Sequence, residues 1–454
     1  MLNKNEIYQT EITDITEDGS GVGRIDGMCV FVPKTAVGDI CDVRIVKVLK
    51  SYVYGKLEKL ITPSPDRCDS DCDVFGRCGG CTLRHMTYES ELRLKESIVH
   101  NNLLRIGKLT DCKLLPIDAT GASAHYRNKA QFPVAMNKNG LAVGFYAKHS
   151  HDVINTVDCA LQPKLFSDIV ALIRAFITEN SISVYDESSH SGLLRHIFLR
   201  SSANCESISL CLVINGEKLP HCDKLISTVI SDFPQVKSIC LNVNREKTNV
   251  IMGKKCITVH GDEYITDTLC GLKFNISPLS FYQVNHDGAE LLYGKAAEFA
   301  ELTGNETVLD LYCGAGTIGL SVAHKAKSVI GVEIIPQAIE NAKQNALQNG
   351  ITNAEFMCAD ASKAVTVLHQ QGVKPDVIIV DPPRKGCDIS VLTALVQFAP
   401  KRIVMVSCNS ATLARDMAYL CENGYKAVKA QPVDMFPRTM HVEAVALLQR
   451  DINS

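Results

Sequence analysis

The sequence contains no tryptophan, few other aromatic residues and no long apolar segment. Nowhere does it reach the run of about 18 apolar residues that a membrane-spanning helix requires. Its first residues, MLNKNEIYQTEITD, are polar and lack the apolar core of a secretory signal. The sequence therefore predicts a globular protein of the cytoplasm that does not enter a membrane.

The chain also lacks a large net charge. Its formal charge at pH 7 is −3, so the overall electrostatics give no sign of a nucleic-acid partner, and any basic surface must be local. A length of 454 residues favours two or three domains. Nothing demands an assembly larger than a monomer, which is the state that we expect.

The 19 cysteines do not fit a framework of disulfides. Their number is odd, many lie within apolar strand-like runs such as SISLCLVI, and no secretory signal accompanies them. The pattern favours metal binding or catalysis by a few of them.

Residues 8 to 61 alternate between apolar and polar in the manner of strands, with glycine turns between short runs such as MCVFVP and DVRIVKVL. This spacing predicts a small β-barrel. Its later part carries cations and tyrosines in the mixture that single-stranded nucleic acid needs, namely Arg44, Lys47, Lys50, Tyr52, Tyr54, Lys56 and Lys59. A solvated strand face is the alternative interpretation.

The proline-marked segment TPSPDR, residues 62–67, indicates a linker after the barrel. A helix is predicted from about Tyr88 to Ile106, and residues 120–265 are strand-rich. From about Leu272 strands alternate with helices, which predicts a parallel sheet with helices on both faces. We expect an α/β protein with three domains, residues 1–62, 63–270 and 271–454. The helix near 88–106 is a candidate for packing on the last domain.

The last domain begins with a pattern that is typical of a cofactor site. In TVLDLYCGAGTIGLSVA a buried strand ends at Asp310, and a glycine turn before the next helix lets a ligand approach the backbone. Glu333 ends the next strand and can accept hydrogen bonds from both ribose hydroxyls, while Asp360, after the following strand, suits an adenine edge. Nicotinamide dehydrogenases and methyltransferases share such a turn, so the turn alone leaves both open.

The strand in DVIIVDPPRKG ends at Asp381. Two prolines there form a rigid turn without free backbone donors, where a transferred group would lie, although such a turn is also found as ordinary structure. DNA adenine methyltransferases have an aromatic residue after a similar turn. Arg384 stands in this place, which disfavours methylation of an amino group.

Cys408 follows the strand RIVMVS and precedes a helix start, where amide dipoles are expected to favour its thiolate. The C5 atom of a uracil is too weak a nucleophile to take a methyl group unaided, but a thiolate that adds at C6 makes C5 reactive. The C5 proton must then leave to a general base. Glu443 in MHVEAVALL is the candidate base, with His441 expected on the same strand face.

A cysteine cluster follows the linker. Cys72, Cys78 and Cys81 form a C-x5-C-x2-C pattern around two glycines, and Cys68 precedes them. Such spacing is typical of a thiolate metal site, and a zinc site made of these four cysteines is compatible with it. The radical S-adenosylmethionine pattern is absent, because it would need a cysteine at Val74.

The segments DLYCGAGTIGL, DPPRKG, VSCN followed by ATLARD, and FPRTMHVE resemble the signatures of the RNA uracil-5-methyltransferase family. The resemblance covers nearly the whole chain and implies a Rossmann-like domain with S-adenosylmethionine as cofactor, Cys408 as nucleophile and Glu443 as base. It also implies contacts to the cofactor from Gln283, Tyr312, Glu333 and Asp381. One departure is Ser410, where the family has proline after Ser-Cys-Asn.

The same resemblance implies a [4Fe-4S] cluster in the central domain, held by Cys72, Cys78, Cys81 and Cys159, with Cys68 as a spectator. Methyl transfer needs no electron, so we expect this cluster to organise the central domain or the RNA path. The barrel resembles the TRAM domain, an OB-like RNA-binding module. Barrel and cluster together fit family members that act on 23S ribosomal RNA, with no role for DNA.

Two rival functions are kept open. The first is methylation of transfer RNA by the same chemistry. The second is a non-catalytic iron–sulfur protein that binds RNA or carries electrons, which would have no need for both Cys408 and Glu443.

Overall fold

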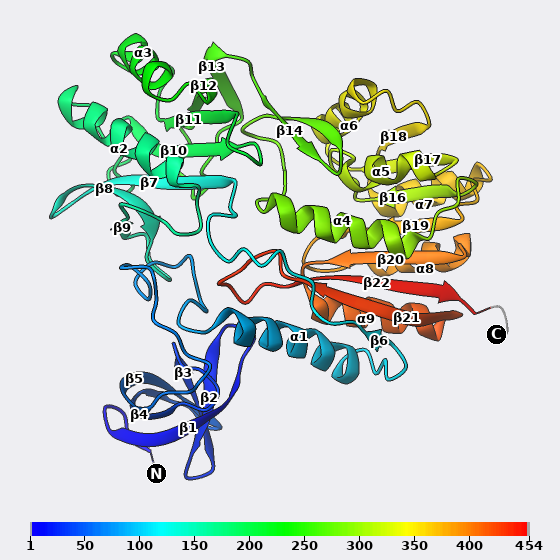
Figure 1. Ribbon diagram of the computed structural model, residues 1–454, viewed down its shortest axis with the longest axis horizontal. Helices are drawn as coiled ribbons and strands as arrows, with labels where there is room; N and C mark the ends of the chain where they lie inside the picture. The colour runs from blue at the N-terminus through cyan, green and yellow to red at the C-terminus, as the bar shows by residue number, and fades with distance from the viewer. Residues whose placement is uncertain (1, 452–454) are drawn as a thin grey trace.

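The computed structural model describes residues 2–451, which fold into three packed parts coloured from blue to red along the chain in Figure 1. The first part is a closed barrel with strand order β1-β2-β3-β5-β4. Its strands are β1 Ile7–Ile15, β2 Ser20–Ile25, β3 Met28–Pro33, β4 Ile40–Val48 and β5 Tyr52–Thr62. Alternate residues such as Val30, Val32 and Val43 are completely buried inside it. The predicted barrel is confirmed.

The central part is a sheet of order β13-β12-β11-β10-β7-β8-β9. Its strands are β7 Lys129–Asn137, β8 Gly140–Tyr146, β9 Val153–Asn155, β10 Leu194–Ser201, β11 Ile208–Ile214, β12 Val236–Val243 and β13 Lys255–Gly261. Two helices, α2 Lys164–Glu179 and α3 Cys222–Asp232, share an apolar core with this sheet. Buried residues recur in α2 every three or four positions, so one apolar face of the helix lies on the sheet.

The last part is a sheet of order β18-β17-β16-β19-β20-β22-β21-β6. Its strands are β16 Thr307–Leu311, β17 Ser328–Glu333, β18 Ala354–Cys358, β19 Val377–Val380, β20 Arg402–Ser407, β21 Tyr425–Val433, β22 Glu443–Arg450 and the short β6 Lys113–Leu114. The strands from β18 to β20 are parallel, and β22 joins antiparallel to β20. The strand order reverses between β16 and β19, and ligands of such sheets bind at the carboxyl ends beside this point.

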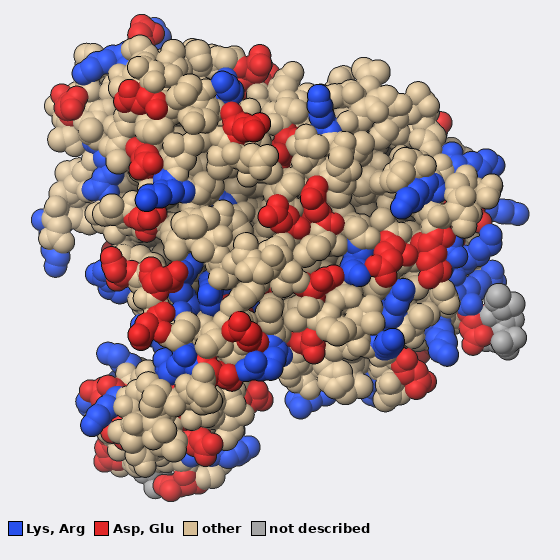
Figure 2. Space-filling view, viewed as in Figure 1, with Lys and Arg blue, Asp and Glu red and all other residues tan. Residues whose placement is uncertain are grey.

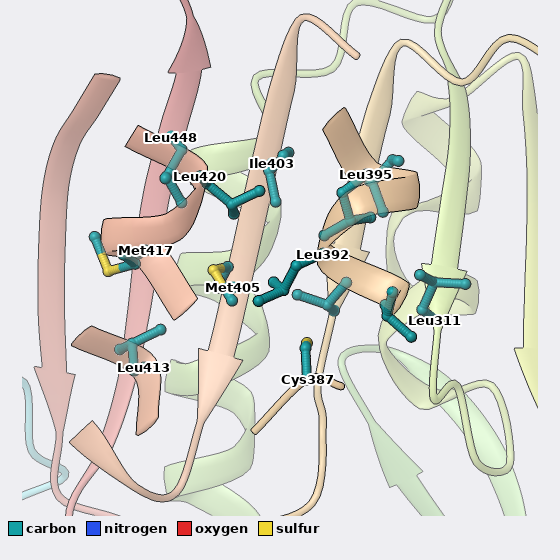
Figure 3. Packing of buried hydrophobic residues seen from close by; sticks show 14 of the residues in the cluster. Leu311, Cys387, Leu392, Leu395, Ile403, Met405, Leu413, Met417, Leu420 and Leu448 are labelled. Atoms are coloured by element: carbon teal, nitrogen blue, oxygen red, sulfur yellow. The ribbon is translucent and has the colours of Figure 1, made fainter. Parts of the chain in front are cut away.

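Helices cover both faces of this sheet, namely α4 His286–Ala300, α5 Thr317–Val322, the 3-10 helix η1 Ala323–Lys325, α6 Pro336–Gln348, α7 Ala361–Gln370, α8 Ile389–Phe398 and α9 Ser410–Glu422. On one face, Leu392 of α8 and Met417 of α9 converge on Met405 of β20 (Figure 3). On the other, Phe299 of α4 lies in the same apolar cluster as Val404 of β20. The α/β architecture is therefore as predicted. No helix among residues 2–451 is long and apolar enough to cross a membrane.

Two segments that precede the last sheet in the chain pack against it. Helix α1, Tyr88–Arg105, lies beside α9 and contributes Val99 and Leu103 to the core shared with α8 and α9 (Figure 1). The hairpin of β14 Ile265–Leu269 and β15 Leu272–Ile276 contributes to the core under α4. The domain boundary expected at 270/271 falls inside this hairpin, so the packing puts the break before Ile265.

Candidate active site

Asp310 lies at the switch point, near the carboxyl end of β16, and is almost completely buried. Its Oδ2 accepts a hydrogen bond from the amide of Gly319 at 2.9 Å. Its Oδ1 is buried and has no hydrogen-bond partner among the described residues. Burial raises the pKa of Asp310 to about 7, and the charges of Asp381 and Glu333 add to this rise. A bound ligand with a donor group would satisfy the unpartnered oxygen.

The loop after Asp310 is held open by an unusual backbone. Gly314 and Gly316 have φ angles of 55° and 80°, and Tyr312, which is not glycine, has a φ of 65°. A side chain at Gly314 would meet no atom within 4 Å, so the space above this glycine is open. Strain of the kind seen at Tyr312 concentrates at functional sites, where surrounding structure enforces it. The loop therefore offers a cradle that fits a ligand.

Glu333 and Asp360 both shape this edge of the sheet through the backbone. Glu333 ends β17 and accepts hydrogen bonds from the amides of Gly314 at 3.2 Å and Ile335 at 2.9 Å. Asp360 caps α7 by accepting from the amide of Ser362 at 3.1 Å, and the Ser362 hydroxyl lowers the pKa of Asp360. The two acids thus order the loops that would face a cofactor.

Gln283 approaches the same region from the segment before α4. It contributes to the electrostatics of the buried hydroxyl of Tyr293, which accepts a hydrogen bond from Thr317 at 3.3 Å at the start of α5. The charge of Asp381 raises the pKa of Tyr293 further, so Asp381 lies close to this group. Gln283, Asp381 and the glycine loop therefore lie in one region of the structure. Tyr293 was not predicted, because nothing distinguishes it from other apolar positions of a helix.

Cys408 and Glu443 belong to neighbouring antiparallel strands. The ladder between β20 and β22 ends with Ser407 opposite Ala444. Cys408 directly follows this pair on one strand, and Glu443 directly precedes it on the other. The structure therefore places the thiol and the carboxyl group side by side at the carboxyl edge of the sheet.

The electrostatics of this pair differ from the expectation for Cys408. Burial raises the pKa of the Cys408 thiol, the charge of Glu443 raises it further, and Arg384 opposes both. The prediction of an easily formed thiolate at the helix start is therefore wrong, because burial outweighs the effect of the helix start. Burial likewise raises the pKa of Glu443 to about 8, with Asp381 adding and Arg384 opposing.

Arg384 is a site residue that the sequence did not reveal as one, since its only signal was its position after the Pro-Pro turn. Helix α9 holds this turn in place. Asn409 caps α9 and donates from Nδ2 to the carbonyl of Arg384 at 3.2 Å, while Arg415 donates to the carbonyl of Lys385 at 3.0 Å. The Ser-Cys-Asn segment therefore positions both the thiol and its neighbouring cation.

His441 does not share a strand face with Glu443. Strand β22 begins at Glu443, so the alternation expected of a strand does not reach His441. His441 is exposed, whereas Glu443 is only 5% exposed. The expected orientation of one residue by the other is therefore not supported.

A buried ion triad supports the segment that leads to Glu443. Lys95 of α1 donates to Glu91 and to Asp434, both at 2.7 Å, and to the carbonyl of Phe436 at 3.1 Å. The side chains of Lys95, Glu91 and Asp434 are completely buried. Tyr88 also donates to Asp434, at 2.8 Å. Helix α1 thus fixes the turn after β21, from which the chain enters β22.

The cysteines of the predicted metal site line one cavity. This cavity, of about 280 Å³, borders β7 and β8 and is lined by Cys72, Cys78, Cys81 and Cys159 among other residues. Burial raises the pKa of Cys159 to about 11, and the charges of Cys81 and Cys78 contribute, so these thiols lie near one another. Cys68 does not line the cavity and donates instead to the carbonyl of Met86 at 3.0 Å.

The barrel carries an aromatic surface. Tyr52 contacts both Phe31 and Tyr54 edge to face, with ring centroids 5.3 and 5.6 Å apart, and Tyr54 is 42% exposed. Arg44, one of the cations expected at this surface, is held by two hydrogen bonds to Glu58. Lys, Arg, Asp and Glu are interspersed over the face of the barrel seen in Figure 2. The aromatic rings are therefore the more distinctive feature.

Known proteins share this architecture over nearly the whole chain. The tRNA (uracil-5-)-methyltransferase family matches residues 88–451, and the TRAM domain matches residues 3–57. An uncharacterised RNA methyltransferase of Halalkalibacterium halodurans is 46% identical over 448 residues, which cover 99% of this chain and 98% of the relative. Another, of Clostridium tetani, is 43% identical over 447 residues and covers 98% and 97%.

A solved structure gives the same picture. The Pyrococcus abyssi tRNA (uracil-54, C5)-methyltransferase, in complex with S-adenosyl-L-homocysteine, is similar with a TM-score of 0.77 at 28% identity. The match covers 97% of this chain and 100% of that one. The protein therefore belongs to the tRNA (uracil-5-)-methyltransferase family, whose members are S-adenosylmethionine-dependent RNA methyltransferases, and it carries an N-terminal TRAM domain.

Proposed function

We propose that this protein methylates C5 of a specific uridine in 23S ribosomal RNA. The observation that carries the reaction type is the position of Cys408 beside Glu443 at the ends of β20 and β22. The residues proposed to hold S-adenosylmethionine, which supplies the methyl group when bound, are Gln283, Tyr312, Glu333, Asp360 and Asp381. The open glycine loop and the unpartnered oxygen of Asp310 fit such a ligand.

In the proposed reaction, Cys408 gives its proton to solvent and its sulfur adds to C6 of the uracil, which makes C5 nucleophilic. Arg384 lowers the pKa of both Cys408 and Glu443, so its positive charge favours the anions that the reaction needs. Once C5 carries the methyl group, the Glu443 carboxylate takes the C5 proton and the Cys408 thiolate leaves. The uracil must be extruded from its stack or lie in a loop to meet the thiol.

A fluorinated substrate tests the nucleophile. RNA that contains 5-fluorouridine has no C5 proton to lose, so with S-adenosylmethionine it should stay bound to the wild type as a covalent complex. Cys408→Ala should form none, whereas Cys358→Ala, which removes an exposed cysteine of the same domain, should trap normally. Equal trapping by Cys408→Ala would remove Cys408 from the proposed role.

Transfer RNA is the second candidate substrate. It is favoured by the similarity to the Pyrococcus abyssi tRNA (uracil-54, C5)-methyltransferase, which covers 97% of this chain and so includes the barrel. The barrel therefore does not by itself separate the two substrates. Unmodified 23S and transfer RNA transcripts, incubated with the enzyme and mapped by mass spectrometry, should yield 5-methyluridine in the former. Both RNAs occur in the cytoplasm, where we propose that the protein acts as a monomer.

The cysteine cavity fits the proposed [4Fe-4S] cluster better than a zinc ion. A tetrahedral zinc site with bonds of about 2.3 Å holds its sulfurs about 3.8 Å apart. Within the described residues, no three of Cys68, Cys72, Cys78, Cys81 and Cys159 have sulfurs within 4.8 Å of one another. An iron–sulfur cube separates its thiolates more widely, and the cavity leaves room between them.

Analysis of metal and sulfide tests this assignment. Protein purified without oxygen should be brown, absorb near ~400 nm and contain iron and sulfide. Cys159→Ser should lose this absorbance, whereas Cys68→Ser should keep it, because Cys68 lies outside the cavity. Colourless protein with one zinc ion would overturn the assignment.

A further inference from the structure

A second group of cysteines lies in the central sheet. Cys211 of β11, Cys240 of β12 and Cys256 of β13 have sulfur atoms that all lie within 4.8 Å of one another. Cys211 pairs with Cys240 in the parallel ladder, and Cys256 pairs with Asn242 in the next one. Cys211 and Cys240 are almost completely buried, and Cys256 is half-buried. Three adjacent strands therefore direct their thiols to one point.

This point is on the side of the sheet away from the helices. Leu210, Leu212 and Leu241, which alternate with the cysteines along the strands, join the core under α2 and α3. The cysteines instead form a separate small cluster with Phe198, against which Met252 packs. The three sulfurs are thus not part of the main apolar core of the domain.

The immediate surroundings favour a negatively charged sulfur. The Asn242 side chain donates from Nδ2 to the sulfur of Cys256 at 3.3 Å. This donor marks the sulfur of Cys256 as a polar position rather than as part of an apolar core.

The group is distinct from the cysteine cavity described above. That cavity borders β7 and β8, whereas the trio occupies β11, β12 and β13, and β10 lies between the two sets in the sheet. None of the trio lines the cavity.

We propose that Cys211, Cys240 and Cys256 bind a thiophilic d10 metal ion, Zn²⁺ or Cu⁺. Thiolates are preferred ligands of both ions, and sulfurs within 4.8 Å need only a small movement to reach the spacing of about 3.8 Å in a zinc site. Three metal–sulfur bonds form, the thiol protons of the three cysteines pass to solvent, and no atom changes oxidation state. A fourth position is left for water on Zn²⁺ or for the thioether of Met252 on Cu⁺. The ion fastens the edge strand β13 to β11 and β12.

Metal counting on the full-length protein tests the proposal. Reduced protein, kept without oxygen, is titrated separately with Zn²⁺ against a chromophoric chelator and with Cu⁺ against bicinchoninate. In the titration with the ion that the site prefers, wild type should bind one more metal ion per protein than Cys240→Ala. Loss of one ligand should lower the affinity for this metal ion by more than about 100-fold, because loss of a contact that only supports a ligand lowers metal affinity by about 10–100-fold. Cys222→Ala, at the start of α3, is the matched control and should bind like wild type.

A second variant guards against misfolding. Cys256→Ser changes one atom on the half-buried edge strand and should also lose the extra equivalent, while it keeps the methyl transfer activity of wild type. Equal metal binding by wild type, Cys240→Ala and Cys256→Ser in both arms would overturn the proposal. So would a disulfide within the trio after exposure to air, combined with no extra metal in the reduced protein, because that result assigns the thiols to redox chemistry.

Discussion

Glu443 is deeply buried, yet the role of base proposed for it requires its anion. Burial raises its pKa to about 8, which favours the protonated carboxyl group near neutral pH. Arg384 is the nearby positive charge that opposes this shift, and Asp381 is the negative charge that increases it. A cationic ligand beside Asp381 would therefore favour the Glu443 carboxylate.

The pH dependence of turnover should report on Glu443. We expect the rate of adduct breakdown to rise with pH through about 8, because only the carboxylate accepts the C5 proton. Glu443→Gln should accumulate a methylated covalent complex on unmodified RNA at every pH. Rapid-quench measurements between pH 6 and 10 would check this, with Glu422→Gln on the exposed end of α9 as control. Rapid turnover by Glu443→Gln would exclude Glu443 as base.

The same residue should lower the stability of the folded protein at high pH. Its pKa is raised from 4.5 to about 8, so the folded state binds the proton more tightly and loses stability as pH rises above 4.5, up to about 8. Glu443→Gln should therefore be more stable than wild type at pH 9, by at most about 5 kcal/mol. The difference should disappear near pH 4.5. Urea unfolding at the two pH values measures it.

Ser410 occupies the position after Ser-Cys-Asn where the family has proline, and it makes a contact that proline could not make. Its hydroxyl accepts a hydrogen bond from Asn102 of α1 at 2.9 Å, and it is the first residue of α9. Proline is favoured at that position, because the amide there has no acceptor within the helix. We expect Ser410→Pro to change the free energy of unfolding by no more than about 1 kcal/mol and to trap fluorinated RNA like wild type. Loss of trapping would show that the bond to Asn102 is needed.

At the scale of elements, helix α1 is the main support of the catalytic edge. It reaches the turn before β22 through Lys95, whose two acidic partners sit on α1 itself and on the segment after β21. The hydrogen bonds between β20 and β22 then hold Glu443, at the start of β22, next to Cys408, at the end of β20. A helix that precedes the central sheet in the chain is thus linked by direct contacts to Glu443 and Cys408.

Removal of the buried cation should therefore affect both stability and catalysis. Lys95→Met leaves the buried carboxylates of Glu91 and Asp434 without their partner and should cost about 3–5 kcal/mol of unfolding free energy. Its rate of covalent trapping should fall as well. Arg93→Ala, which breaks an exposed ion pair between α1 and Asp66 in the segment after the barrel, should cost less than about 1 kcal/mol. Similar unfolding curves for the two variants would contradict this account.

At the scale of the whole molecule, we expect the barrel to contribute a surface for RNA rather than a catalytic group. Tyr54→Ala removes the exposed ring and should weaken RNA binding by about 1–3 kcal/mol if a base stacks there. The rate of methyl transfer within the bound complex, kcat, should not change, so the effect should appear as a higher KM. Tyr264→Ala, which removes an exposed ring outside the barrel, is the control. An unchanged KM for Tyr54→Ala would exclude stacking at this ring.

The sequence predicted the elements whose signals are local. The glycine turn, the Pro-Pro turn and the Ser-Cys-Asn segment each follow an apolar strand, and parallel strands must bring their carboxyl ends to one edge. Helix α2 was missed although its apolar residues recur at helical spacing, because the strand-rich flanks dominated the interpretation. The sequence also predicted a lowered pKa for Cys408, whereas the structure raises it. The cause is burial, which depends on packing that no local pattern encodes.

Other features were beyond any sequence pattern. Lys95 meets Asp434 across 339 positions, and the cysteine trio is drawn from three separate strands. Only the assembled sheets create these neighbours. Cys159 was assigned through family resemblance alone, because its distance from Cys81 in the chain carries no metal-binding signature.

The long gap between α1 and its partners has a consequence for the making of the protein. Ribosomes add about 5–20 residues per second, so Asp434 is synthesised roughly 20–70 s after Lys95. Throughout that interval the nascent α1 has no finished catalytic sheet to pack on, while the barrel before it can already close. The charged side chains of Lys95 and Glu91 are compatible with this delay, because they keep this face of α1 polar in water until the last strands are synthesised.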